Sequence, residues 1–147
     1  MFKPKRILVP TDFSSASRVA VNQAKEIAEL CNSELVIIHV KAKEAENLPL
    51  FFLDDSKIDE INKHLDEHID HEIEKIKNDV FKGSIVKPTV RICHGNPYDE
   101  IIKTADSMAC DLIVISSKGK SALDGFFFGS ITEKVARRAH CSVLISR

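Results

Sequence analysis

Short apolar runs rich in β-branched residues recur along the chain, and segments with a helical period separate them. The runs are Ile7–Val9, Leu35–Val40, Val86–Cys93, Leu112–Ile115 and Ser142–Ile145. Near-continuous apolar runs are typical of strands that are buried on both faces of a parallel sheet. The alternation therefore predicts an α/β fold with a five-stranded, parallel, doubly wound sheet of the Rossmann-like type and strand order 3-2-1-4-5. The length of 147 residues suits a single domain, 1–147.

Four segments carry apolar residues at steps of three and four, which predicts helices. They are Ala16–Leu30, Ile58–Val80, Pro97–Ala109 and Ile131–Ala139. Hydroxyl-bearing residues within 11–15 offer N-caps for the first helix, and Gly83 follows the second. We expect residues 41–57 between the second strand and the second helix to be irregular.

Composition and charge argue against several classes of protein. The formal net charge is -1, which argues against a dedicated nucleic-acid binder. No apolar run approaches the roughly 20 residues that a membrane-spanning helix needs. The first residues lack the apolar region of a signal peptide, so we expect a cytoplasmic protein. The spacings of Cys31, Cys93, Cys110 and Cys141 match no zinc pattern, and we expect reduced thiols that pack as small apolar groups.

Polar residues follow the first and fourth predicted strands. Doubly wound sheets bind ligands at the carboxyl ends of the strands where the strand order reverses, which here is between these two strands. Pro10-Thr11-Asp12 and Ser116–Gly119 would face each other across this crevice. The convergence of glycines, hydroxyls and lysines favours an anion-binding site, and a solvated turn is the alternative.

The start of the last predicted helix also favours an anion, because its free N–H groups and its dipole attract negative charge. Gly129 would allow a phosphate to approach the backbone closely. Ser130-Ile131-Thr132-Glu133 fits a capping box, which predicts Ser130 as the N-cap residue. Gly119-Lys120-Ser121 is not the end of a P-loop, because Val114 stands where that motif needs a glycine.

One further motif matches a metal site by its letters alone. His64-Leu65-Asp66-Glu67-His68 fits the H-x-x-E-H pattern of zinc proteases. On a helical wheel these histidines and His71 lie off the isoleucine stripe, among charged residues. That position indicates a solvated helix face rather than a catalytic zinc site.

Three apolar features allow either packing within the chain or contact with a partner. Phe126–Phe128 and Leu48–Leu53 are apolar segments in predicted loops. They either pack onto the core or form a partner surface. The last strand, if it is a sheet edge, has free backbone groups that could pair with a second copy.

Several segments together resemble the universal stress protein family along nearly the whole chain. They are Ile7–Ser14, Gly95-Asn96-Pro97, Cys110–Ile115 and the end of the chain from Gly129-Ser130 through Cys141–Ile145. The ATP-binding branch of that family carries G-x-x-G, nine residues and then G-[ST]. Gly119 fits the second glycine, Lys120–Phe128 supply the nine residues and Gly129-Ser130 follow, whereas Ser116 replaces the first glycine. The fold implied is the adenine nucleotide alpha hydrolase-like form of the Rossmann-like fold.

The resemblance implies an ATP site in the crevice, with any Mg²⁺ held mainly by the phosphates. Asp12 and Val40 would contact adenine, and Pro10 and Ser116 would lie at the ribose. Near the phosphates we expect Ser117, Lys118, Gly119, Gly129, Ser130, Ile131 and Thr132, and Thr11 and Ile115 complete the nucleotide-binding set. A serine at 116 would cost about 1–2 kcal/mol if the position needs a positive φ, and its side chain could also crowd the ribose. On either ground, Ser116→Gly should tighten binding.

The resemblance implies a cytoplasmic, ATP-binding, stress-response regulatory module that dimerises through the last strand, around Val143 and Ile145. Two alternatives stay open: a dimeric interaction protein of the same family that binds no nucleotide, and a slow ATP hydrolase. For hydrolysis the sequence offers no assured general base, because Asp12 and Asp124 are only nearby acids. The sequence therefore favours a non-enzymatic role, with neither nucleic acid nor membrane as a partner.

Overall fold

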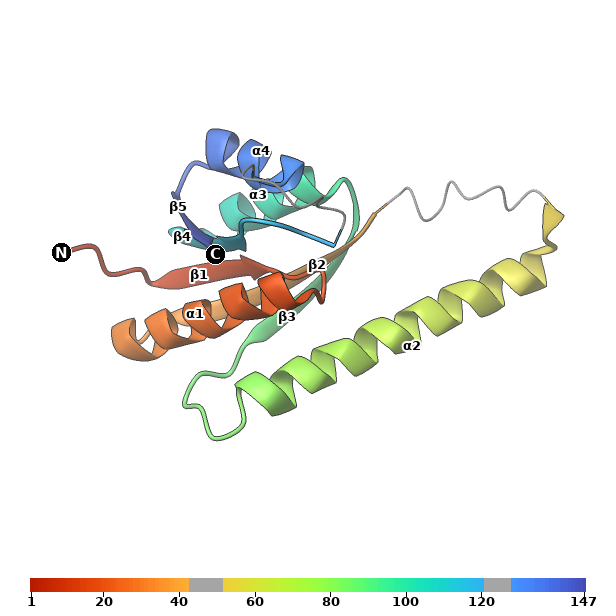
Figure 1. Ribbon diagram of the computed structural model, residues 1–147, viewed down its shortest axis with the longest axis horizontal. Coiled ribbons are helices and arrows are strands. Elements are labelled where there is room, and N and C mark those ends of the chain that lie inside the picture. Colours follow the sequence, from red (N-terminus) through yellow and green to blue (C-terminus); the bar gives the residue numbers. More distant parts are fainter. Residues whose placement is uncertain (43–51, 121–127) are drawn as a thin grey trace.

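Five parallel strands form the sheet of the computed structural model, which describes residues 1–42, 52–120 and 128–147 (Figure 1). In chain order the elements are β1 (Arg6–Pro10), α1 (Ser15–Cys31), β2 (Glu34–Ala42), α2 (Asp55–Val80), β3 (Thr89–Gly95), α3 (Pro97–Ser107), β4 (Leu112–Ser116), α4 (Ser130–Arg138) and β5 (Ser142–Ser146). The strands lie in the order β3-β2-β1-β4-β5. The predicted fold class and strand order are therefore confirmed.

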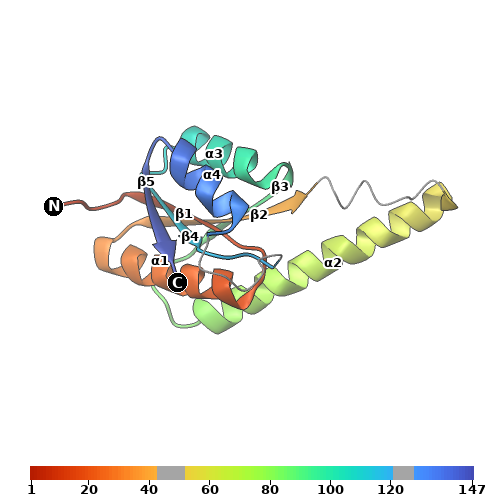
Figure 2. The same ribbon diagram turned by 45° about the horizontal axis from the view of Figure 1, so that its top comes forward.

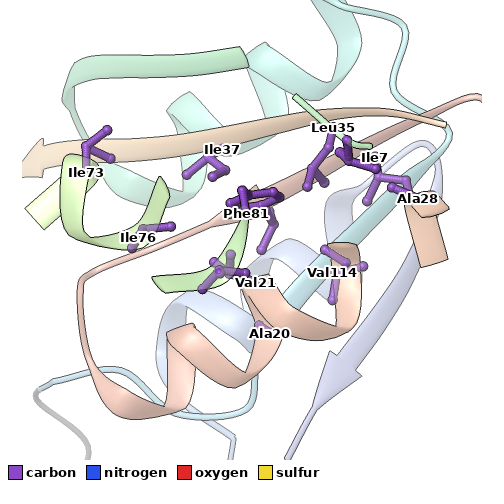
Figure 3. Packing of buried hydrophobic residues seen from close by; sticks show 14 of the residues in the cluster. Ile7, Ala20, Val21, Ala28, Leu35, Ile37, Ile73, Ile76, Phe81 and Val114 are labelled. Carbon is purple, nitrogen blue, oxygen red and sulfur yellow. The ribbon is translucent and has the colours of Figure 1, made fainter. Parts of the chain in front are cut away.

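Helices cover both faces of this sheet (Figures 1 and 2). α1 and α2 lie on one face, and α3 and α4 lie on the other. Because alternate strand residues point to opposite faces, each central strand contributes to two cores. The core beneath α1 and α2 includes Ile7, Val21, Leu35, Ile37, Ile76 and Phe81 (Figure 3). The core beneath α3 and α4 includes Leu8, Val36, Ile38, Ile101 and Val135.

Side chains cap the first turns of α1 and α3. Ser14 caps α1, because its hydroxyl accepts a hydrogen bond from the Ser17 amide at 3.1 Å. Asn96 caps α3 through the Tyr98 amide, and Pro97 occupies the first helical position. The hydroxyl cluster and the proline therefore mark the starts of these helices as predicted.

The capping box predicted for α4 is wrong. Gly129 is the N-cap residue, with φ -59° and ψ 150°, and no side chain caps this helix. Its carbonyl accepts the first helical hydrogen bond from the Glu133 amide at 3.0 Å. Ser130 is consequently the first helical residue, so its hydroxyl does not take the position from which a cap would bond.

Three predicted boundaries shift for local reasons. β3 begins at Thr89 rather than Val86, because Pro88 has no N–H group for the strand ladder. α3 ends at Ser107, and Ala109 has a φ of 50° that a helix cannot continue through. The segment 41–57, expected to be irregular, is regular at both ends, because β2 runs to residue 42 and α2 begins at residue 55. Its remaining part, 43–51, lies outside the described residues.

The apolar stripe of α2 is deeply buried only in the second half of the helix, at Ile69, Ile73, Ile76 and Val80. In the first half Ile61 and Leu65 are 38% and 44% exposed, and Figure 1 shows this half extending beyond the sheet. His64, His68 and His71 are exposed, as predicted. In the described part of the chain, no three His, Cys, Asp or Glu side chains are grouped to hold a metal ion. No described helix, α2 included, combines the length and apolarity needed to cross a membrane.

The cysteines are free thiols. Cys110 is buried against the α3 and α4 core, and burial raises the pKa of its thiol to about 11. Cys31, Cys93 and Cys141 are half-buried. These positions fit the expectation of thiols that pack as small apolar groups.

Candidate functional site

A cavity of about 220 Å³ lies at the carboxyl ends of β1 and β4, where the strand order reverses. Connections leave the two strands on opposite faces of the sheet, so their loops part and leave space between them. The lining residues are Pro10, Thr11, Asp12, Ser17, Ile38, His39, Val40, Pro97, Ile101, Ile115, Ser116, Lys118, Gly119, Gly129, Ser130, Ile131 and Thr132. Every predicted site residue except Ser117 belongs to this lining.

Asp12 joins the two loops across the cavity. Its Oδ1 accepts hydrogen bonds from the amide and hydroxyl of Ser14, and its Oδ2 accepts one from the Lys120 amide at 2.8 Å. Burial raises the pKa of Asp12, but these hydrogen bonds together outweigh burial, so the pKa lies below its ordinary value. The carboxylate is therefore ionised at neutral pH, and protein donors already occupy both of its oxygens.

Gly119 packs directly against this carboxylate. A Cβ at position 119 would lie 2.9 Å from Asp12 Oδ2, closer than real Cβ contacts come. Gly129 has more room, because a Cβ there would meet the Ser117 carbonyl oxygen at 3.6 Å as its nearest neighbour. Glycine is therefore needed at 119 for the close approach of loop and carboxylate, whereas Gly129 serves as the N-cap of α4.

Ser116 is buried and takes part in two hydrogen bonds. Its Oγ donates to the Lys118 carbonyl at 2.8 Å, and its own carbonyl accepts from Thr132 Oγ1 at 2.7 Å. Among the described non-glycine residues, only Phe13, Asn32 and Ala109 have a positive φ. The expected strain of a serine at 116 does not arise, so strain is the wrong reason to expect tighter binding from Ser116→Gly.

Ser117 does not line the cavity, and its hydrogen bonds come from its backbone. Its amide donates to the Ser146 carbonyl of β5, and its carbonyl accepts from the Gly129 amide, both at 2.8 Å. Ser117 is thereby tied to β5 on one side and to the start of α4 on the other. These bonds fix Ser117 and Gly129 relative to the end of β5.

The first turn of α4 contributes unpaired donors to the cavity. The amides of Ser130, Ile131 and Thr132 have no hydrogen-bond acceptor within the described residues, as is usual for the first turn of a helix. Lys118 lines the same cavity, and its ammonium group forms no ion pair with a described residue. We call Lys118, Ser130, Ile131 and Thr132 the anion cradle, because amides at a helix start and a free cation favour an anion.

Lys120, in contrast, is not part of this cradle. Its Nζ lies over the Phe13 ring, 5.9 Å from the ring centroid, and it does not line the cavity. Phe13 in turn stacks on His39 at 4.3 Å and takes a left-handed φ of 65°. His39 Nδ1 donates to the Thr11 carbonyl at 2.8 Å, and burial lowers the pKa of the imidazole. These contacts hold the turn after β1 in the conformation that directs Asp12 toward the cavity.

A second part of the lining is apolar. It comes from β2, β4 and α3 and consists of Ile38, Val40, Pro97, Ile101 and Ile115. A flat apolar group can pack against these side chains while an attached anion occupies the cradle. One cavity thus combines an apolar surface with a few polar groups, which is the usual composition of a small-molecule site.

Five lining residues are absent from the sequence-based set: Ser17, Ile38, His39, Pro97 and Ile101. Pro97 and Ile101 follow β3, whose carboxyl end lies at the same edge of the sheet. Because ligands bind at the carboxyl ends of the strands in such sheets, this position in the sequence is a signal that could have found both residues. Ser17 contacts the Thr11 hydroxyl at 3.1 Å from within α1. That contact depends on how α1 packs against the sheet and leaves no pattern in the sequence.

Comparison with known proteins adds family and fold. Residues 3–147 match the family model described as the universal stress protein family. The universal stress protein MJ0577 of Methanocaldococcus jannaschii is 29% identical over 153 residues, which cover 96% of this chain and 93% of that protein. The structure of universal stress protein UspA from Lactobacillus plantarum has a TM-score of 0.86 at 26% identity and covers 100% of both chains. The crystal structure of a universal stress protein in complex with cAMP has a TM-score of 0.73 at 24% identity, covers 99% of this chain and 98% of that one, and shares the fold.

Proposed function

The chain belongs to the universal stress protein family, and we propose that it binds ATP in the cavity between β1 and β4 and acts as a nucleotide-dependent regulatory module. The observation that carries this proposal is the union of an apolar surface and the anion cradle in one cavity. A nucleotide needs both, because it joins a flat base to charged phosphates. A family member of the same fold in complex with cAMP supports an adenine nucleotide as the ligand class.

Each part of the cavity has a role in this proposal. The apolar residues pack against the base. Asp12 Oδ2 accepts one hydrogen bond from the Lys120 amide and keeps a lone pair for the adenine amino group. Pro10 and Ser116 lie at the ribose. The cradle holds the phosphates through the free amides of α4 and the Lys118 ammonium. The dipole of α4 adds to this attraction.

The cavity offers a poor set of protein ligands for Mg²⁺. Asp12 is the one carboxylate among the described lining residues, and its oxygens already accept hydrogen bonds. Mg²⁺ would therefore enter with the nucleotide and be held by phosphate oxygens and water, where it neutralises phosphate charge. The lowered pKa of Asp12 also makes it a weak general base, so we propose binding rather than hydrolysis. Asp124 lies outside the described residues.

Thermal unfolding with and without Mg-ATP tests the proposal. Ligand at 100 times its Kd stabilises the folded state by about 2.7 kcal/mol, which should raise Tm by roughly 5–10 °C. Lys118→Ala should weaken this effect, whereas Lys120→Ala is the matched control because its ammonium lies over Phe13 instead of lining the cavity. A Tm that does not change at millimolar Mg-ATP would refute nucleotide binding and favour an interaction protein.

We also propose that two copies pair through β5. This strand is an edge of the sheet, so one row of its backbone groups is free to pair, and Leu144 is 36% exposed. Val143 and Ile145 on this strand pack against the α3 and α4 core. Light scattering should report a dimer that Leu144→Lys disrupts. Ile92→Lys, on the opposite edge strand and 38% exposed, is the control that should leave the dimer intact.

A further inference from the structure

We propose that Arg147 supplies a second cation beside the anion cradle and makes the site distinguish nucleotides by their number of phosphates. The inference rests on the proposed nucleotide site and adds a specificity residue to it. Arg147 directly follows β5, and its guanidinium lies over the Phe128 ring, 5.6 Å from the ring centroid. Phe128 immediately precedes Gly129, the N-cap residue of α4.

Backbone pairing fixes Arg147 next to the cradle. Ser146 is the register partner of Ser116, and its carbonyl accepts from the Ser117 amide at 2.8 Å. The Ser117 carbonyl accepts in turn from the Gly129 amide at 2.8 Å. The end of β5, the loop after β4 and the start of α4 therefore meet at one place, and Arg147 leaves β5 there.

The guanidinium of Arg147 forms no ion pair with any described residue. Three other arginines are paired: Arg6 with Glu34, Arg18 with Asp79 and Arg137 with Glu133. Stacking on an aromatic ring supports the plane of a guanidinium and leaves the N–H donors at its edge free for an oxyanion. A guanidinium that a ring holds beside helix amides is suited to a phosphate group when, as here, neither has a partner among the described residues.

The position of Arg147 predicts which phosphate it meets. Arg147 does not line the cavity, so only a ligand that extends past the first turn of α4 can contact it. A single phosphate on the α4 amides ends within the cradle, whereas a triphosphate continues outward and carries more charge. Arginine binds phosphate through two parallel hydrogen bonds. ATP should therefore gain affinity from Arg147, and AMP should not.

Calorimetric titration of the full chain with Mg-ATP and with AMP measures this difference. We expect Arg147→Ala to weaken Mg-ATP binding by about tenfold and AMP binding by less than about twofold. Arg147→Lys keeps the charge without the two-pronged geometry and should fall between wild type and Arg147→Ala. Arg138→Ala is the matched control, because Arg138 also lies over a ring, that of Tyr98 at 5.9 Å, and its loss changes the net charge equally.

The possible results separate this inference from the proposed function. Equal weakening of Mg-ATP and AMP by Arg147→Ala, or an equal effect of Arg138→Ala on Mg-ATP, would overturn the role of Arg147 while nucleotide binding stands. A wild-type chain that binds neither nucleotide overturns the proposed function itself. Light scattering on the same variants is the last check: a dimer lost with Arg147→Ala at an unchanged ATP-to-AMP ratio assigns Arg147 to assembly and overturns the inference.

Discussion

Replacing Gly119 with alanine tests whether its contact with Asp12 shapes the site. The added Cβ would lie 2.9 Å from Asp12 Oδ2. The carboxylate cannot turn away freely, because Ser14 holds Oδ1 and the Lys120 amide holds Oδ2. Relief requires the loss of the bond from Lys120, which is worth about 1.5–3 kcal/mol because its acceptor is charged. For a domain of this size we expect Tm to fall by roughly 3–12 °C, with weaker Mg-ATP binding because the loop moves away from the cradle.

Thermal unfolding followed by circular dichroism measures the stability cost of this substitution. Gly129→Ala is the matched control, since its Cβ would have a nearest contact of 3.6 Å, and it should cost less than Gly119→Ala because it loses only the preference of an N-cap for glycine over alanine. Asp12→Ala removes the atom that clashes, so Gly119→Ala should cost little in that background, which corresponds to a coupling energy of about 1–3 kcal/mol. If Gly119→Ala costs the same with and without Asp12, the reasoning is refuted, because the clash would lie elsewhere.

Three further outcomes follow from the same loops and from the core. Ser14→Ala removes a helix cap and should lower the free energy of unfolding, measured in urea, by about 1 kcal/mol. Ser130→Ala, in a helix capped by glycine, should change it by less than about 0.5 kcal/mol. Equal losses in the two variants would contradict the assigned caps. The pKa of Asp12 in the folded chain lies below its ordinary value of 3.8, so its stabilisation is complete above about pH 5 and is lost as the pH falls from 3.8 through the folded-state pKa. Asp12→Asn should therefore reduce the loss of stability below about pH 4. If this variant loses as much stability in acid as the wild type does, Asp12 is not the cause of the loss. Burial raises the pKa of Cys110 to about 11, so about one thiol in a thousand is ionised at pH 8. Mass spectrometry should show that iodoacetamide modifies Cys110 far faster in urea than in the native chain. Rapid modification of Cys110 in the native chain would contradict its burial.

The sheet could be predicted from the sequence because burial on both faces leaves a signal within each strand. Ile7–Val9 and Leu112–Ile115 have no polar face, and only the centre of a parallel sheet accommodates such runs. Strand order followed from the handedness of the crossovers, and the place of the cavity followed from strand order. Periodicity and topology are enough to predict these features, because neither depends on side-chain contacts.

The details of the site could not be predicted in the same way, because they depend on loop conformation. The bond from the Lys120 amide to Asp12 crosses between segments that no periodic pattern relates. Ser130 has the right letters for a capping box, yet the cap depends on the backbone of the preceding glycine. The stacking of Arg147 on Phe128 likewise requires the end of β5 and the start of α4 to be placed side by side.

Ser116 shows how a departure from a motif changes its meaning once the backbone is known. A glycine in a loop motif suggests a position with a positive φ, where a serine would be strained and would weaken ligand binding. Here the position lacks a positive φ, and the serine hydroxyl bonds the Lys118 carbonyl at 2.8 Å. Glycine would remove that bond and give the backbone more conformational freedom to lose on binding. Ser116→Gly should therefore weaken Mg-ATP binding in the calorimetric titration, whereas tighter binding would show that the hydroxymethyl group crowds the ribose.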